Sequence, residues 1–452
     1  MSTLKLTFWG GVGSVTGANF LLQDEKTNIL VDCGLLQGVA GSAEENAKPF
    51  PYNPAEMDFL FITHAHMDHI GRVPKLVRDG FAGTIYSTPE TRELAEIMFA
   101  DAVKVMDMNE REGKGKSLYT TDDANKAMSL WKSFVYDTDN TLTSTFSVRL
   151  LDAGHILGSS MYQFSHNGKT IVFTGDSGNS PSPLLRDTEK ITGADYLIID
   201  SVYGDRNHEP KAERDARFAE IIQETITAGG ALVMPMFSIE RTQVVLYELN
   251  NMVEDGKIPA VPVFLDSPLA LKVTEVYKHS TDLFNDAVQQ EIKGGDDIFS
   301  FPKLKIVHSG YESQKVEDIP NPKIIMAGSG MSEGGRVVHH EMNFITDPKS
   351  TILLMGYQAV GTLGSRIQAK PNSIDIDGQT LPVRARIEMI SGYSSHKDSE
   401  HLVEMVSDTA YSVKKVFVVM GEPKSSMFLV QRLRDYLDVD ALYPERGKVY
   451  SI

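Results

Sequence analysis

Residues 64–69 place three histidines and one aspartate in an H-x-H-x-D-H pattern, directly after the apolar segment 59–62. Ligands at alternate positions of an extended loop point the same way, so His64 and His66 can bind one ion. Asp68 and His69, at the turn into the next expected helix, can bind another. A single histidine is usually an ordinary surface or core residue. Four ligand-type residues in this pattern, after an expected strand, instead indicate a site for two adjacent metal ions.

Two further positions could complete such a site. His155 stands at the end of an expected strand among small residues, and Asp176 stands at the end of another, beside Gly175. Each is a weak signal alone, because a lone histidine is more often structural and a Gly-Asp pair is usually a turn. Given the first cluster, Asp176 could bridge two ions and His155 could complete the ligands of the first.

Composition limits the class of protein. A chain of 452 residues suggests two or three domains, and 41 % hydrophobic with 23 % charged residues is typical of a globular protein. One cysteine, Cys33, leaves no disulfide framework and no cysteine-based zinc site. The start lacks signal-peptide features and no apolar run approaches the ~18 residues that span a bilayer, so a cytoplasmic protein without a membrane partner is expected.

The net charge of −17 argues against a protein that coats nucleic acids generally. It allows a polyanion in a narrow, locally positive groove where metal ions supply much of the positive charge.

The pattern of expected elements changes along the chain. The first ~200 residues favour short strands in mixed sheets, with a hairpin at Asn167-Gly168. We expect a helix at 70–78, beginning at the histidine cluster, and another at 94–107. After about residue 208, strands alternate with small-residue loops and helices, which is typical of a parallel sheet. The expected strands are 5–9, 19–22, 28–31, 59–62, 147–151, 162–165, 170–174, 231–235, 263–265, 323–326, 351–355, 385–390 and 416–420.

These motifs, in this order, resemble a known family. L-V-D at 30–32, the H-x-H-x-D-H cluster, G-H at 154–155 and T-G-D at 174–176 resemble the metallo-β-lactamase fold. The later motifs resemble the β-CASP branch of that fold, and more closely its RNA-processing members, which include the mRNA 3′-end cleavage endonuclease and its prokaryotic relatives. They are D-S-V-Y-G-D-R at 200–206, S-G-M at 329–331 with G-G-R at 334–336, G-Y-Q-A at 356–359 with G-T-L-G at 361–364, and S-S-H at 394–396.

The resemblance implies an α/β protein, with an αββα metallo-β-lactamase sandwich and an inserted α/β β-CASP domain built on a parallel sheet. The implied boundaries are 1–207 for the first part of the sandwich, 208–370 for the insertion and 371–452 for the completing segment.

It also implies two Zn²⁺ sites. The first zinc would be held by His64, His66, His155 and Asp176, and the second by Asp68, His69 and Asp176. Asp32 would orient a histidine ligand. The candidate catalytic residues are Asp68, Asp200 and His396, where His396 would be the general acid. Asp200 could orient His396 and raise its pKa, because a carboxylate favours the protonated imidazole. Without the resemblance, His396 would be an ordinary surface histidine.

Two positions depart from the family pattern. Asp200 stands where the family usually has glutamate, so the charge remains but the reach is shorter. Met420 stands where RNA-processing members have a histidine that completes the second zinc site, and a thioether is a poor zinc ligand. The second site is therefore expected to bind more weakly, or activity is expected to depend on added Zn²⁺ or Mn²⁺.

Glycine-rich turns of the insertion are candidates for gripping RNA phosphates, because they leave backbone N–H groups free at helix N-termini. The candidates are Ser329, Gly330, Arg336, Gly361 and Thr362. The alternative is close helix–sheet packing for the glycines and a structural salt bridge for Arg336. The neighbouring pair His339-His340 is interpreted as helix surface rather than as a metal site.

The resulting prediction is a zinc-dependent ribonuclease that hydrolyses single-stranded RNA, as an endonuclease, a 5′→3′ exonuclease or both. Two ions ~3.5–4 Å apart would supply a bridging hydroxide and a clamp on the phosphoryl oxygens. One alternative is a catalytically weakened paralogue that binds RNA or a partner in a processing complex, which Met420 favours. A DNA nuclease is the other. The resemblance also makes a homodimer plausible. The RNA substrate and the cleavage direction stay open.

Overall fold

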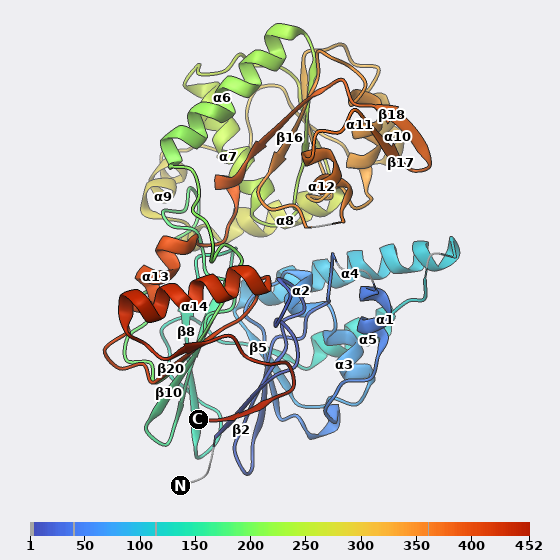
Figure 1. The fold of residues 1–452 in the computed structure, drawn as a ribbon. Coiled ribbons are helices and arrows are strands. Elements are labelled where there is room, and N and C mark those ends of the chain that lie inside the picture. Colours follow the sequence, from blue (N-terminus) through green and yellow to red (C-terminus); the bar gives the residue numbers. More distant parts are fainter. Residues whose placement is uncertain (1–3, 39–40, 114, 360) are drawn as a thin grey trace. The chain divides into compact units, whose positions relative to one another are not determined.

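Two segments distant in the sequence form one unit of the chain, and the segment between them forms another (Figure 1). The computed structural model describes residues 4–38, 41–113, 115–359 and 361–452. Unit 1 comprises Met1–Asn207 and Ser395–Ile452, and unit 2 comprises His208–Ser394. Among the described residues, none of the helices is long and apolar enough to cross a membrane.

Unit 1 contains two sheets that, in the described part of the chain, have seven strands each. The first consists of β1 (Lys5–Phe8), β2 (Phe20–Gln23), β3 (Asn28–Val31), β4 (Phe59–Phe61), β5 (Thr84–Ser87), β6 (Trp131–Ser133) and β22 (Val449–Ser451). The second consists of β7 (Asn140–Thr141), β8 (Phe146–Asp152), β9 (Ser160–His166), β10 (Lys169–Phe173), β11 (Tyr196–Ile199), β20 (Lys415–Val418) and β21 (Ala441–Leu442). Both sheets are mixed: β1–β2 and β9–β10 are antiparallel, while β3–β4 and β10–β11 are parallel.

An apolar core lies between these sheets, because both contribute buried side chains to it. Phe8, Phe20 and Phe61 come from the first sheet, and Phe164 and Phe173 come from the second. Every second residue at the start of β8 is buried, as a strand with one face on a core requires.

Helices cover the outer faces of the two sheets. The helical elements of unit 1 are α1 (Ser42–Ala47), η1 (Pro54–Glu56), α2 (Met67–Ile70), α3 (Val73–Arg78), α4 (Pro89–Arg111), α5 (Thr121–Ser129), α13 (Ser399–Ser407) and α14 (Pro423–Leu437). Leu402 of α13 and Leu429 of α14 pack in a second core against β10, β11 and β20. Figure 1 shows α3 and α5 on the side of the first sheet. The layers form the expected αββα sandwich.

Unit 2 is built on a parallel sheet in the order β14–β13–β15–β12–β16–β19. Its strands are β12 (Ala231–Pro235), β13 (Val263–Asp266), β14 (Leu304–Ile306), β15 (Lys323–Ala327), β16 (Thr351–Met355) and β19 (Arg386–Ile390), and a separate antiparallel hairpin pairs β17 (Ser373–Ile376) with β18 (Gln379–Pro382). Every residue of β12, β15 and β16 is buried, as expected for parallel strands covered on both faces. The helical elements are α6 (Lys211–Ala228), α7 (Arg241–Glu254), α8 (Pro268–His279), η2 (Thr281–Leu283), α9 (Asp286–Lys293), α10 (Gly310–Lys315), α11 (Arg336–Phe344), α12 (Leu363–Gln368) and η3 (Ser391–Tyr393).

The structure differs from the sequence expectations in two places. The chain returns to unit 1 at Ser395 rather than at 371, because β19 pairs with β16 and extends the parallel sheet of unit 2. The expected helix 70–78 is two helices, α2 and α3, so Asp68 and His69 lie inside a helix rather than before one. Pro74 explains the break, because proline fits the first turn of α3 but cannot continue α2.

Candidate metal centre

The candidate site residues of unit 1 follow the carboxyl ends of strands. Asp32 follows β3, and residues 63–69 follow β4, its parallel neighbour. Asp176 follows β10, and Asp200 follows β11, which is again a parallel neighbour. His155 follows β8. The carboxyl ends of parallel neighbours meet at one edge of a sheet, so segments far apart in the sequence bring their polar side chains together there.

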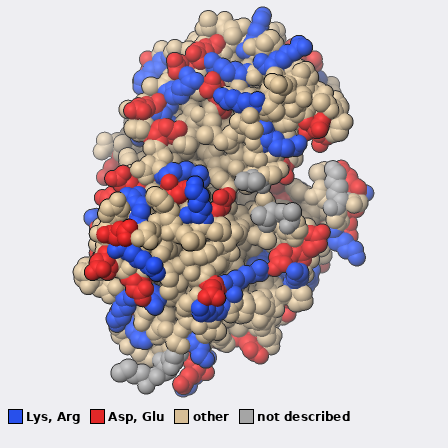
Figure 2. All heavy atoms as spheres, in the orientation of Figure 1, with Lys and Arg blue, Asp and Glu red and all other residues tan. Residues whose placement is uncertain are grey.

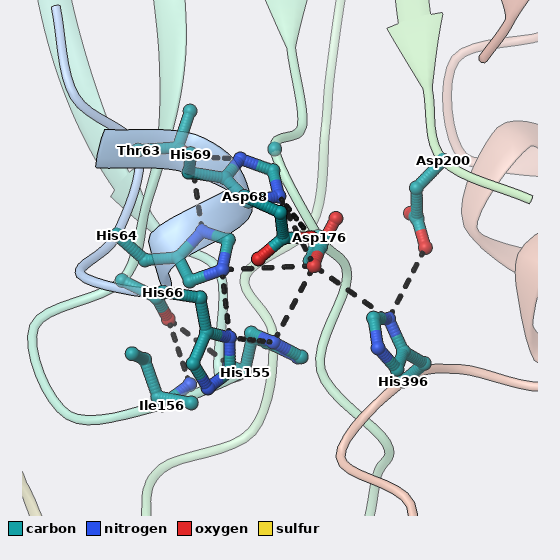
Figure 3. Close-up of polar contacts among 12 residues, drawn as sticks. Thr63, His64, His66, Asp68, His69, His155, Ile156, Asp176, Asp200 and His396 are labelled. Atoms are coloured by element: carbon teal, nitrogen blue, oxygen red, sulfur yellow. Dashed lines mark hydrogen bonds and ion pairs between the residues drawn. The ribbon is translucent and has the colours of Figure 1, made fainter. Parts of the chain in front are cut away.

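Four donor atoms face one another in the first group, formed by His64, His66, His155 and Asp176 (Figure 3). His66 Nδ1 lies 3.0 Å from His64 Nε2 and 3.3 Å from His155 Nε2. Asp176 Oδ2 lies 3.6 Å from the Nε2 atoms of both His64 and His155. Tetrahedral zinc with ligands at about 2.0–2.2 Å places neighbouring donor atoms about 3.3–3.6 Å apart. The group therefore fits such an ion.

A second group of donors shares Asp176 with the first and adds Asp68 and His69. His69 Nε2 lies 3.4 Å from Asp176 Oδ2 and 3.7 Å from Asp68 Oδ2. His69 Nε2 and Asp176 Oδ1 are buried, and neither makes a hydrogen bond within the described part of the chain. Buried polar atoms without hydrogen bonds are costly, and a cation bound between these residues would satisfy them.

Buried oxygens form hydrogen bonds with the Nδ1 atoms of His64 and His69, while their Nε2 atoms face the donor cluster. Asp32 Oδ2 lies 2.8 Å from His69 Nδ1, and the Thr63 hydroxyl donates to the same oxygen at 2.9 Å. Since that hydroxyl donates its proton to Asp32, it can only accept from His64 Nδ1, 3.0 Å away. When their rings are neutral, both histidines are thereby fixed in the tautomer whose Nε2 lone pair faces the donor cluster. Asp32 is predicted from the sequence and Thr63 is not, although a hydroxyl between an expected strand and the first histidine of the cluster is a usable signal.

The protonation states suit cation binding. Burial lowers the pKa of His64 and His155 well below the usual range, so both rings are neutral and able to donate lone pairs. Burial also lowers the pKa of His69, but the carboxylates of Asp176 and Asp32 outweigh it and raise that pKa well above the usual range. A proton on His69 thus compensates negative charge where a metal ion would do so, and metal binding displaces such protons.

His396 lies at the edge of the cluster, in a third group with Asp176 and Asp200. Its Nδ1 is 3.8 Å from Asp176 Oδ2 and 3.9 Å from Asp200 Oδ2, and 21 % of its side chain is exposed. Asp200 Oδ1 accepts a hydrogen bond from the Ser177 amide at 3.1 Å, which fixes that carboxylate. Burial lowers the pKa of His396, but Asp176 and Asp200 raise it above its ordinary value. The protonated imidazole is therefore favoured, as a proton donor requires.

Met420 lies in the apolar core. Its side chain is 1 % exposed and belongs to the cluster that contains Phe20 and Phe173. The sulfur faces Gly11, where an added Cβ would lie 2.6 Å from it. The imidazole and carboxylate donors of the second group are those of Asp68, His69 and Asp176. This thioether packs as a core side chain does.

The candidate phosphate-binding residues all lie in unit 2, where several already have partners. The Ser329 hydroxyl accepts from the Glu333 amide at 3.0 Å. A Cβ on Gly330 would lie 2.2 Å from the Phe237 ring, so this glycine permits close packing. Arg336 Nη1 lies 2.6 Å from Asp266 Oδ1, and 24 % of the arginine side chain is exposed.

The remaining two candidates lie at the start of α12. Thr362 is the N-cap and accepts from the Ser365 amide at 3.2 Å. Gly361 has φ +94° and no atom within 4 Å of an added Cβ, so the backbone conformation explains this glycine. The next amide, of Leu363, donates to Glu333 Oε1 at 2.9 Å. The Glu333 carboxylate thus already accepts the hydrogen bond of an amide that could otherwise donate to a phosphate oxygen.

Comparisons with known proteins match the chain along most of its length. Residues 13–243 match the family model of the metallo-beta-lactamase superfamily, 242–367 that of the Beta-Casp domain, and 380–444 that of the Zn-dependent metallo-hydrolase RNA specificity domain. Ribonuclease TTHA0252 of Thermus thermophilus is 33 % identical, over 94 % of this chain and 95 % of its own.

Other relatives and one solved structure agree with this match. The transcription termination factor FttA of Methanosarcina mazei is 31 % identical over 97 % of this chain and 70 % of its own, and an RNase J-like protein of Methanocaldococcus jannaschii is 28 % identical over 99 % of each chain. A crystal structure of an Enterococcus faecalis protein of unknown function covers all of both chains at 12 % identity and a TM-score of 0.56, which supports the fold alone.

The sandwich and its His/Asp cluster define a metallo-β-lactamase-fold hydrolase. With the Beta-Casp domain inserted and the RNA specificity domain following it, the chain belongs to the β-CASP family of this superfamily.

Proposed function

We propose that this protein is a metal-dependent ribonuclease that hydrolyses phosphodiester bonds of single-stranded RNA. The observation that carries the proposal is the position of His396, a histidine that favours its protonated form, beside donor groups suited to metal ions. The match to an RNA specificity domain and the relative named as a ribonuclease support RNA as the substrate.

The proposed cofactor is Zn²⁺ in two sites of unequal strength. The first group offers four donors, whereas the second offers three, one of them shared. Since a site with fewer donors holds its ion less firmly, the second ion should exchange more readily, and added Mn²⁺ should be able to replace it. Bound divalent ions would activate water and neutralise charge on the phosphoryl oxygens. Dialysed protein that keeps two tightly bound ions per chain would contradict the unequal sites.

The protein's own residues would position and transfer protons. His396 would protonate the leaving alkoxide, because that oxygen is too basic to depart as an anion at neutral pH. Asp200, held by the Ser177 amide, would favour the protonated imidazole and orient its ring. Asp68, whose side chain is 18 % exposed, is the most accessible carboxylate of the second group and would orient the attacking water.

The proposed contacts to RNA phosphates are those of Ser329, Gly330, Arg336, Gly361 and Thr362. Exposed atoms of Arg336 and the open Gly361 are the most accessible of this set. The negative net charge does not oppose this, because Lys and Arg side chains lie interspersed with acidic ones on the face in Figure 2. Endonuclease and 5′→3′ exonuclease action are both compatible with the proposal.

A second candidate function is favoured by one observation. Met420 packs in the core and leaves the second donor group with three residues. A protein that binds RNA without cutting it efficiently would show this feature. A DNA nuclease is the third candidate.

Matched single-stranded RNA and DNA oligomers of one sequence separate these candidates. We expect cleavage of the RNA, and loss of about 10²–10⁴-fold in rate for His396→Ala, which is the usual contribution of a general acid. Preferential cleavage of DNA would support the DNA nuclease. Tight RNA binding without cleavage under any added metal would support the weakened paralogue.

A further inference from the structure

Lys397, the residue after His396, is a buried lysine with a defined set of partners. Only 6 % of it is exposed. Its Nζ donates to the Gly178 carbonyl at 2.7 Å and to the Ser180 hydroxyl at 3.1 Å. Its backbone amide donates to the Ser177 carbonyl at 2.8 Å. Burying an ammonium group is costly unless hydrogen bonds compensate it, so these contacts hold Lys397 in one place.

The acceptors of Lys397 belong to the segment that follows Asp176. Gly178 forms an isolated antiparallel bridge with His396. The Asn179 amide donates to the Ser395 carbonyl at 2.8 Å. The lysine therefore completes a short ladder between residues 177–180 and 395–397, and its ammonium provides the side-chain link of that ladder.

One atom of this ladder also supports the metal centre. His155 Nδ1 donates to the Ser395 carbonyl at 3.0 Å. That bond leaves His155 Nε2 with its lone pair toward the first donor group. Ser395 thus orients a candidate metal ligand, while the residue after it is the candidate general acid. A displacement of this segment would disturb both.

The opposite side of the ladder is fixed. The Gly178 amide donates to the Ala153 carbonyl at 2.9 Å, and the Thr188 hydroxyl donates to the carbonyls of Gly178 and Ala153 at 3.1 and 3.0 Å. A Cβ on Gly178 would lie 2.0 Å from the Gly154 carbonyl oxygen, so this backbone packs without space. Lys397 therefore donates to a segment of unit 1 that is itself hydrogen-bonded and closely packed.

We propose that Lys397 is a positioning residue, whose buried ammonium holds the segment 395–397 so that His396 stays beside Asp200 and the Ser395 carbonyl stays beside His155. This inference rests on the proposed function, because it assigns Lys397 an effect through His396. It adds a residue whose hydrogen bonds go to Ser177, Gly178 and Ser180 rather than to a metal donor.

The test is Lys397→Met, which keeps an unbranched side chain one atom shorter and removes its hydrogen-bond donors. Lys323→Met is the matched control, because Lys323 is also buried, with 1 % exposed, and lies in unit 2. Its ammonium donates to the backbone carbonyls of Val316, Glu317 and Ile319. Ser180→Ala is a milder variant that removes one acceptor and should act in the same direction if Lys397→Met folds poorly.

The first readout is the single-turnover rate on RNA and on bis(p-nitrophenyl) phosphate, whose leaving group departs without a proton. Misplacing a catalytic group by about 1 Å can cost ~10²-fold. We expect Lys397→Met to lose on the order of 10- to 100-fold on RNA and much less on the nitrophenyl ester. In a His396→Ala background, Lys397→Met should cause a much smaller further loss on RNA, because only its effect through Ser395 and His155 then remains. Equal losses on both substrates, additive losses in the double variant, or a rate equal to that of Lys323→Met would overturn the proposal.

The second readout does not depend on activity. Hydrogen exchange of the amides in 394–399 should accelerate in Lys397→Met and stay unchanged in Lys323→Met. Unchanged exchange in Lys397→Met would overturn the proposal even if the wild-type protein cut no RNA. If the wild type cut no RNA but exchange were faster in Lys397→Met, the proposed function would be contradicted. The structural part of the inference, that Lys397 holds the segment 395–397, would still stand.

Discussion

Asp32 Oδ2 accepts a hydrogen bond from His69 Nδ1 over 2.8 Å, and both side chains are completely buried. Asp32 adopts φ +60°, a left-handed conformation that costs energy for a residue with a side chain. Its other oxygen accepts from the Thr63 amide at 2.8 Å. This carboxylate therefore ties the strand end of β3 to the donor cluster after β4, and its strained backbone is held by those bonds.

Asp32→Asn should weaken metal binding without unfolding the protein. An amide NH₂ in the place of Asp32 Oδ2 cannot accept from His69 Nδ1 or from the Thr63 hydroxyl, so the bond that orients the ring of His69 is lost. Loss of such a supporting group typically costs about 10–100-fold in metal affinity. Metal content after dialysis against a graded chelator measures this. Asp24→Asn is the control, because Asp24 pairs with the buried His166 at 3.1 Å in the same unit, and an equal loss there would contradict the assignment.

Met420→Ala should destabilise unit 1 and leave its metal content unchanged. Removing a buried methionine side chain from a packed core costs about 2–5 kcal/mol, whereas Met420→Leu keeps the volume and should cost less than about 1.5 kcal/mol. Urea unfolding monitored by tryptophan fluorescence measures the stability of unit 1, because both tryptophans, Trp9 and Trp131, belong to that unit. Loss of one metal ion in Met420→Ala would mean that the thioether is a ligand after all.

Glu333→Gln should tighten RNA binding if the start of α12 contacts phosphate. The substitution keeps an acceptor for the Leu363 amide and removes a negative charge beside it. We expect an increase of a few-fold in affinity that shrinks at high salt, because phosphate contacts are electrostatic. Fluorescence anisotropy with labelled RNA in an Asp68→Ala/His69→Ala background measures it. Glu254→Gln removes the same charge from the end of α7, and an equal gain there would indicate a non-specific effect of net charge.

Glu341 should make the stability of unit 2 decrease as pH rises. Burial raises its pKa from the ordinary value of 4.5 to about 8, although the hydrogen bond from the Ser332 hydroxyl lowers it in part. The folded state thus holds a proton that the unfolded state releases between pH 4.5 and 8. The contribution is fully present below pH 4.5 and is lost as pH rises through about 8. Calorimetric unfolding across this pH range should show a smaller decrease in stability for Glu341→Gln than for the wild type. Identical pH profiles of the two proteins would contradict the raised pKa of Glu341.

The fold could be predicted well from local sequence patterns because they coincide with the packing. The strands 28–31, 231–235 and 351–355 have the expected bounds, and Asn167-Gly168 joins β9 to β10 with both residues at positive φ. An apolar run bounded by small residues is sufficient to predict a strand and its bounds where that strand is buried on both faces.

Tertiary contacts explain what could not be predicted. His340, interpreted from the sequence as helix surface, is completely buried and lies 2.7 Å from Asp266, 74 positions away. Arg336 meets the same carboxylate. No local pattern reveals that these groups converge on one aspartate, since the pairing depends on where β13 meets α11.

The candidate site likewise contains residues that local sequence predicts and residues whose roles depend on tertiary contacts. The donors within 64–69 are close in sequence, so their spacing could be interpreted directly. Thr63 and Lys397 act through hydrogen bonds to partners 31 and 219 positions away, Asp32 and Gly178. Their roles become visible only when the strand ends are brought together.

The most direct test of the central claim is cleavage of an end-labelled single-stranded RNA by the purified protein, beside Asp68→Ala/His69→Ala, with and without added Zn²⁺ or Mn²⁺. The double variant removes two of the three donors of the second group and keeps all four donors of the first group. The account predicts cleavage by the wild type that a chelator abolishes, that added metal restores, and that the variant lacks. Cleavage that persists in the variant or in the presence of chelator would contradict a metal-dependent ribonuclease at this site.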